Sequence, residues 1–338
     1  MLFSVLLSAA FGAAAYAQTS ALNLVYQFPN TSYTNIENVA VRSSNGQLLL
    51  NLATGARMVQ LDPSAADPQP VPVVTLSGPG SLTGIAETSP DVFTVAAGNF
   101  SFGPTVPGGF AGRPGTFSVW SVDLTGPQAV ATQIVAIPEA SALNGLTTVK
   151  GNPDVVLIAD SGLGAVWSVN IKTGAYKIVI QDAQFLPTAA LSLGINGIHT
   201  KKNVLYWTNS ALGTFGSVPI NADGSAAGAI VAIAHAVDST KFDDFALDRR
   251  GNAWVAAQPN ALYQVQTNGA VVLVAGGGND TTLISPTSAV FKGCTLYVVT
   301  GGAGGPAPQS GQVFSLDTCS AAYGGGNGYG GGWKAWTA

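Results

Sequence analysis

The feature that most constrains the fold of this chain is a pattern that recurs six times. Each unit combines a polar or small residue, a short β-prone run, a turn and a second apolar run. The units begin at Glu37, Thr83, Asn144, Asn196, Asp243 and Pro286. Their irregular spacing is close to the length of a four-stranded propeller blade. The sequence therefore predicts an all-β fold, a six-bladed β-propeller.

Composition supports this prediction. Of the 338 residues 42 are glycine, while Val, Ile, Thr and Leu recur in short runs between turn residues, as expected for an all-β chain. The propeller is predicted to span residues 18–319. Within it, the run from Ala21 to Phe28 has no blade of its own, so we expect it to supply the outer strand of the last blade and close the ring.

The two ends of the chain differ from the repeats. Residues 1–17 form a short apolar run that ends in small residues at Ala15 and Ala17, which predicts a secretory signal peptide cleaved after Ala17. No run is long enough for a membrane span. We therefore expect the protein in the secretory pathway, either secreted or within a vacuolar compartment. Residues 320–338 are too rich in glycine for regular packing and predict a C-terminal tail.

Two further features agree with export. Cys294 and Cys319 bracket one predicted hairpin, and in an oxidising compartment they should form a disulfide worth about 3 kcal/mol. With no His or further Cys nearby, metal binding by this pair is not expected. Sequons at Asn30, Asn99 and Asn279 are predicted glycosylation sites.

Charge and motif content exclude several functions. The formal net charge is −4 and basic residues form no cluster in the sequence, so neither nucleic acid nor an anionic membrane is an expected partner. Apolar small molecules are the expected ligands, and the protein is expected to be a monomer. His199 and His235 belong to no recognisable catalytic or metal-binding motif, and His199 is interpreted as a structural histidine.

The repeat predicts where the polar residues meet. The first strand of each blade lines the central channel, so rotation about the axis should bring the six unit-opening residues together at one mouth. Glu37 and Asp243 supply carboxyl groups, and Asn144 and Asn196 supply amides, which are the oxygen ligands that Ca²⁺ or Mg²⁺ prefers. For each residue taken alone, a strand end or turn is the preferred interpretation. Recurrence at one repeat position favours a functional site.

The segments Glu37-Asn-Val-Ala-Val-Arg, Asn196-Gly-Ile-His and Asp243-Asp-Phe-Ala-Leu-Asp resemble the senescence marker protein/gluconolactonase family of six-bladed propellers. The resemblance implies that Glu37, Asn196 and Asp243 bind a divalent cation, and that Asn144 contacts substrate or metal-bound water. Members often carry Glu-Gly-Pro and Asp-Gly at positions where this chain has Glu37-Asn-Val and Asp243-Asp-Phe. The departure adds a carboxyl group and a phenyl ring beside the mouth.

The same segments look like a divergent, secreted fungal branch that includes hetero-Diels–Alderases, which join a tropolone-type quinone methide to a humulene-type terpene. A cycloaddition needs oriented partners and hydrogen-bond donors but no cofactor. In this interpretation Asn144, Asn196 and Asp243 are catalytic. The substrate-binding wall is expected from six aromatic residues: Phe110, Tyr206, Trp207, Phe215, Phe245 and Trp254. For each ring taken individually, ordinary blade packing is the preferred interpretation.

Two alternatives stay open. A lactonase would use Ca²⁺ or another divalent cation to polarise an ester carbonyl, with Asp243 or a metal-bound water as base or nucleophile. A non-enzymatic binding scaffold is the other, because the fold alone does not determine chemistry. The phenyl ring of Phe245 beside the mouth and the scarcity of general acid–base groups favour the pericyclase.

Overall fold

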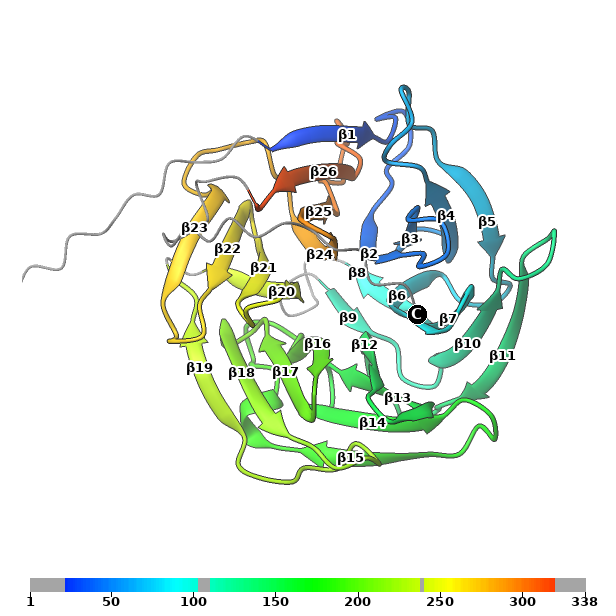
Figure 1. Ribbon diagram of the computed structural model, residues 1–338, viewed down its shortest axis with the longest axis vertical. Helices are drawn as coiled ribbons and strands as arrows, with labels where there is room; N and C mark the ends of the chain where they lie inside the picture. The colour runs from blue at the N-terminus through cyan, green and yellow to red at the C-terminus, as the bar shows by residue number, and fades with distance from the viewer. Residues whose placement is uncertain (1–21, 103–109, 238–239, 320–338) are drawn as a thin grey trace, which may run out of the picture.

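Six four-stranded antiparallel sheets are arranged around a central axis (Figure 1), and a seventh sheet has two strands. The computed structural model describes residues 22–102, 110–237 and 240–319. The arrangement confirms the predicted six-bladed β-propeller. The predicted signal peptide and C-terminal tail lie outside the described residues.

In every blade the innermost strand lies at the axis and the other three follow outward. The six innermost strands are β2 (Ile36–Val41), β6 (Ser81–Ser89), β12 (Leu143–Val149), β16 (Ile195–Lys201), β20 (Lys241–Leu247) and β24 (Pro286–Lys292). The second strands are β3 (Leu48–Leu52), β7 (Val92–Gly98), β13 (Asn152–Asp160), β17 (Val204–Asn209), β21 (Ala253–Gln258) and β25 (Thr295–Thr300).

The outer half of each blade is more exposed. The third strands are β4 (Arg57–Leu61), β10 (Ser118–Asp123), β14 (Ala165–Asn170), β18 (Thr214–Pro219), β22 (Ala261–Val265) and β26 (Gln312–Asp317). The outermost strands are β5 (Val71–Thr75), β11 (Val130–Ala136), β15 (Tyr176–Gln181), β19 (Val231–His235), β23 (Val271–Gly276) and β1 (Asn23–Gln27). A 3₁₀ turn at Ala183–Phe185 follows the third blade.

The first strand of the described residues, β1, completes the last blade, as predicted. In the sixth sheet, in the order β1-β26-β25-β24, Asn23 pairs with Ser315. A disulfide joins Cys294, in the turn before β25, to Cys319, just after β26, with 5.4 Å between the Cα atoms. The closing blade is therefore built from both ends of the propeller and stapled covalently.

The core lies between neighbouring blades. All five residues of β3 are buried, because each sheet is covered on both faces by the adjacent blades, whereas all seven residues of β11 at the outer edge are partly or fully exposed. Six clusters of buried apolar side chains fill the spaces between blades. Among the described residues, no helix has the length and apolar character needed to cross a bilayer.

An insertion between β7 and β10 carries the two-stranded sheet of β8 (Phe100–Phe102) and β9 (Phe110–Gly112). In Figure 1 these strands lie near the centre of the ring, over blades 2 and 3. Gly112 packs closely against the backbone of Ser141, just before β12 begins. The insertion therefore lies at the end of the channel where the innermost strands begin.

Candidate functional site

Every innermost strand has a pairing irregularity near its start, where one or two residues are skipped in the register with the second strand. Such a bulge redirects the extra side chain. The first residues skipped are Glu37, Thr83, Asn144, Asn196, Asp243 and Thr287. Five of them are the predicted ring residues.

The sixth member of the ring differs from the prediction. Pro286 pairs in register with Thr300, so Thr287 occupies the bulged position in the last blade. The Oγ1 of Thr287 donates a hydrogen bond of 2.7 Å to the carbonyl oxygen of Ile36, which ties blade 6 to blade 1. The prediction of Pro286 is wrong because the position of the bulge, and not the start of the repeat, determines which side chain faces the axis.

A cavity of about 370 Å³ opens at this end of the channel, and we call it the mouth cavity. Its lining includes four ring residues, Glu37, Asn196, Asp243 and Thr287, from blades 1, 4, 5 and 6. The other lining residues are Tyr33, Asn35, Ala53, Thr54, Leu191, Leu193, Ser210, Lys241, Gln258, Ser285, Gly302 and Gly304. Thr83 and Asn144, on blades 2 and 3, are buried outside this lining.

Close contact between blades explains why glycine follows the ring residue in blades 2, 3 and 4. A Cβ on Gly145 would lie 2.5 Å from the carbonyl oxygen of Asn196, and a Cβ on Gly84 would collide with the carbonyl oxygen of Asn144. The glycine after the ring residue is therefore required by packing in these blades, whatever the chemistry of the ring residue itself.

In the remaining blades polar side chains replace these glycines and bond to one another. Asn38 Nδ2 donates to Asp244 Oδ2 at 2.8 Å, and Ser288 Oγ donates to Asn38 Oδ1 at 3.0 Å. His199 Nε2 forms a 2.8 Å hydrogen bond with Asp244 Oδ1, in line with its predicted structural role. Asn38, Asp244 and Ser288 are buried one residue after the ring residues of their strands, whereas His199 is partly exposed.

The two carboxyl groups of the mouth cavity hold their protons to higher pH than ordinary carboxyl groups do. Burial raises the pKa of Glu37 to about 7, and the charge of Asp244 adds to the effect. Burial raises the pKa of Asp243 well above its ordinary value, and the charge of Glu37 adds again. A hydrogen bond of 2.6 Å from Gln258 Nε2 to Asp243 Oδ2 opposes that rise. Near neutral pH the pair therefore retains protons that it can donate in hydrogen bonds.

The donor set of the mouth cavity also fits a hard cation. Asn196 is 1% exposed, and its Nδ2 donates to Ser210 Oγ at 2.9 Å, but its Oδ1 has no hydrogen-bond partner. A buried amide oxygen without a partner is costly, and a divalent cation would satisfy it. No group of three or more His, Cys, Asp or Glu residues forms a metal cluster in the described part of the chain. The mouth cavity can therefore hold a divalent cation only if amide oxygens act as ligands together with the carboxylates of Glu37 and Asp243.

The predicted aromatic wall does not gather at the mouth cavity. Phe215 and Phe245 pack together with Tyr206 between blades 4 and 5, Trp207 packs between blades 3 and 4, and Trp254 packs between blades 5 and 6. None of the five lines the cavity. For Phe110 only the backbone, in β9, is described. The apolar part of the lining comes instead from Ala53, Leu191 and Leu193.

Sequence reasoning missed several polar residues of the lining. Asn35 Nδ2 donates to Tyr33 Oη at 3.2 Å, and both residues precede β2. Lys241 is the one basic residue of the lining and is exposed. A signal was present for Lys241, because it lies two residues before Asp243 on the same strand. Gln258 carried no such signal, since it ends a second strand.

No protein-family model matches the chain. A protein of Sarocladium schorii described as "Putative hetero-Diels-Alderase" is 28% identical over 319 residues, covering 82% of this chain and 77% of that protein.

Solved structures share the fold at low sequence identity. A calcium-binding regucalcin from Agrobacterium tumefaciens has a TM-score of 0.60 at 16% identity, covering 88% of this chain and 93% of that one. A gluconolactonase from Xanthomonas campestris has a TM-score of 0.61 at 13% identity, covering 90% and 91%. A luciferin-regenerating enzyme has a TM-score of 0.63 at 14% identity, covering 89% and 96%. The chain thus has the propeller fold of the regucalcin and gluconolactonase structures, and its sequence is similar to that of the Sarocladium schorii protein.

Proposed function

We propose that this protein is a biosynthetic enzyme that catalyses a hetero-Diels–Alder cycloaddition in the mouth cavity. Its substrates would be a tropolone-type quinone methide and a humulene-type terpene. The similarity to the Sarocladium schorii protein supports this assignment. The observation that carries it is the pair Glu37 and Asp243, two carboxyl groups in one cavity whose pKa values are both raised.

The proposed chemistry uses hydrogen bonding and orientation. As the alkene of the terpene adds to the quinone methide, negative charge builds on the carbonyl oxygen of the quinone methide. A protonated carboxyl group of Glu37 or Asp243 donates a hydrogen bond that is stronger in this transition state than in the ground state. Leu191, Leu193 and Ala53 offer apolar contact for the terpene. No proton is transferred, so the carboxyl groups end the cycle unchanged.

A second candidate, a metal-dependent lactonase, is favoured by the unpartnered Oδ1 of Asn196. Glu37, Asn196 and Asp243 would hold a divalent cation, which supplies a Lewis acid for an ester carbonyl. Both carboxyl groups must then be ionised. Protons and the cation compete for the same oxygens, so the two functions respond oppositely to added metal.

This competition provides the test. With EDTA present, the purified protein should accelerate the cycloaddition of a tropolone-type quinone methide with humulene and control its stereochemistry, as followed by chiral chromatography. Millimolar Ca²⁺ should leave the rate unchanged or lower it. Hydrolysis of δ-gluconolactone that requires Ca²⁺, without acceleration of the cycloaddition, would assign the lactonase instead. Turnover of neither substrate would favour the binding scaffold.

Replacing Lys241 by Met is expected to raise KM for the quinone methide about tenfold, with kcat within about twofold of wild type. Lys241 is the only cation in the lining, and a charge-assisted hydrogen bond to a substrate oxygen is worth about 1.5–3 kcal/mol. Steady-state kinetics measure both constants. Lys241→Arg should restore most of the affinity, and Lys150→Met, at an exposed turn of blade 3, serves as the control. An unchanged KM in Lys241→Met would remove this residue from the substrate site.

We also propose that the protein is exported, that it is glycosylated and that it is a monomer. The Cys294–Cys319 disulfide supports export, since such bonds persist in oxidising compartments. Asn30 and Asn279 are exposed, and Asn99 is partly buried with its Oδ1 accepting a hydrogen bond from the backbone of Gly80. Mass spectrometry of the protein secreted by a eukaryotic host tests cleavage after Ala17 and glycan addition together.

A further inference from the structure

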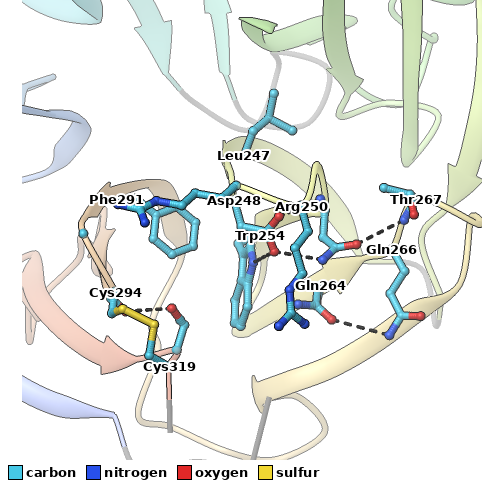
Figure 2. Close-up of a pocket in the computed structure, with 14 residues that line it drawn as sticks. Leu247, Asp248, Arg250, Trp254, Gln264, Gln266, Thr267, Phe291, Cys294 and Cys319 are labelled. Atoms are coloured by element: carbon cyan, nitrogen blue, oxygen red, sulfur yellow. Dashed lines mark hydrogen bonds between the residues drawn. A yellow bond between two sulfur atoms is a disulfide. The ribbon is translucent and has the colours of Figure 1, made fainter. Parts of the chain in front are cut away.

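A second, larger cavity of about 810 Å³ lies on the face opposite the mouth cavity, between blades 5 and 6 (Figure 2), and we call it the basal cavity. The turns after β20 and β24 and the end of β26 form its walls. Its lining residues are Leu247, Asp248, Arg249, Arg250, Asn252, Trp254, Gln264, Gln266, Thr267, Phe291, Gly293, Cys294, Thr318 and Cys319. None of them belongs to the ring at the mouth.

The rim of the basal cavity carries positive charge without a partner. Arg249 and Arg250 are both exposed, and neither guanidinium group forms a hydrogen bond or ion pair within the described part of the chain. Lys201 Nζ donates to the backbone oxygens of Asp248, at 2.6 Å, and Arg249, at 3.1 Å. The turn that presents the two arginines is therefore held in place from the neighbouring blade.

The nearby carboxylate does not neutralise these arginines. Asp248 accepts hydrogen bonds from the backbone N–H of Asn252 at 2.9 Å, from Asn252 Nδ2 at 2.8 Å and from Trp254 Nε1 at 3.3 Å. Figure 2 shows this group of bonds behind the side chain of Arg250. With the carboxylate engaged inside the turn, Arg249 and Arg250 are free to bind an anion, and a guanidinium group pairs with a carboxylate or phosphate through two parallel hydrogen bonds.

The opposite wall of the basal cavity is apolar. Phe291 is partly buried and packs edge-on against Trp254, with 6.0 Å between ring centroids. Figure 2 places Phe291 between Trp254 and the Cys294–Cys319 disulfide. Gln264 and Gln266 supply amide donors on the other side of Trp254. A ligand that satisfies both walls has a flat apolar body against Phe291 and an oxyanion near the arginines.

We propose that the basal cavity binds a small organic oxyanion, an aromatic or similarly flat group that carries a carboxylate or a phosphate. The volume lies within the range of small-molecule sites. The disulfide fixes one wall and the Lys201 contacts fix the other, so the site requires little reorganisation on binding. This assignment does not depend on the reaction proposed for the mouth cavity.

Calorimetric titration of the full chain with four probes tests the proposal. Benzoate and phenyl phosphate carry both features, inorganic phosphate carries the charge alone, and benzyl alcohol carries the ring alone. We expect at least one of the first two to bind about tenfold more tightly than either single-feature probe. The tighter of the two assigns the carboxylate or the phosphate class. The proposal would be overturned if neither aromatic anion binds more tightly than inorganic phosphate and benzyl alcohol do.

Variants locate the binding. Arg249→Gln combined with Arg250→Gln should weaken the aromatic anion about tenfold or more, because both guanidinium groups are lost. Phe291→Leu should remove most of the preference for phenyl phosphate over inorganic phosphate. Arg113→Gln, an exposed arginine on the β8–β9 insertion side, is the matched control and should bind as wild type does. Full affinity in the double variant would place the anion elsewhere.

Discussion

Replacing Glu37 by Ala is expected to lower kcat/KM for the cycloaddition about 100-fold, the typical loss for one preorganised hydrogen-bond donor. Glu37→Gln should stay within about threefold of wild type, because the amide still donates a hydrogen bond into the mouth cavity. A metal site would respond differently, since Gln removes the charge that holds the cation. Steady-state kinetics of the two variants, with circular dichroism to confirm folding, make the comparison.

The pH profile provides a second readout of the same group. Since the pKa of Glu37 is raised to about 7, its protonated form is lost above that pH. The kcat/KM of wild type should therefore fall toward tenfold per unit above about pH 7, while Glu37→Gln should lose this limb. Equal losses in Ala and Gln variants, with activity restored by Ca²⁺ in wild type only, would contradict hydrogen-bond donation by Glu37.

The stability of wild type is expected to fall as pH rises from about 5 to about 8, with about 3 kcal/mol of the loss coming from Glu37, and Glu37→Gln should remove that part of the slope. In the unfolded chain Glu37 titrates near its ordinary value of 4.5, and in the folded protein near 7. Between these values the folded state binds more protons, so stability falls as pH rises. The raised pKa of Asp243 acts in the same direction.

Urea denaturation in EDTA at several pH values measures this slope. Glu139→Gln is a suitable control, because Glu139 is an exposed carboxylate that accepts a hydrogen bond from Tyr176 Oη. Above about pH 7, Glu37→Gln should be more stable than wild type, an unusual sign for a substitution at a functional position. A slope unaltered in this variant would mean that Glu37 titrates normally. Stability recovered by Ca²⁺ at high pH would identify the cation site.

The fold was predictable because its determinants are local and repeated. Two apolar runs around a turn identify each blade in the sequence. The run from Ala21 to Phe28 precedes the first unit and has no blade of its own, which assigned it to the last blade. Cys294 and Cys319 flank one hairpin, so their pairing followed from the same assignment. Four of the ring residues at the mouth cavity or beside it, Glu37, Asn144, Asn196 and Asp243, followed from rotational equivalence.

There is a physical reason why the sequence could not show where the aromatic side chains lie. In a sheet with one solvent-exposed face, alternation indicates which side chains are buried. Propeller blades are covered on both faces, so Trp207 and Phe245 are buried whichever way they point. The sequence could not distinguish a ring at the axis from one between blades. Two further features depend on bulges and strand twist, which leave no clear trace in residue type. They are the position of Thr287, instead of Pro286, in the ring and the presence of Gln258 in the lining of the mouth cavity.

The pairing of β1 with β26 places a demand on how the protein is made. β1 cannot form its backbone hydrogen bonds until its partner β26, almost three hundred residues later in the chain, has been synthesised. Contacts so distant in sequence slow folding, and an unpaired edge invites association with other chains until the ring shuts. The disulfide between Cys294 and Cys319 would hold the β25–β26 hairpin in register until β1 pairs with it. Biosynthesis under reducing conditions should therefore yield more aggregate and less native protein.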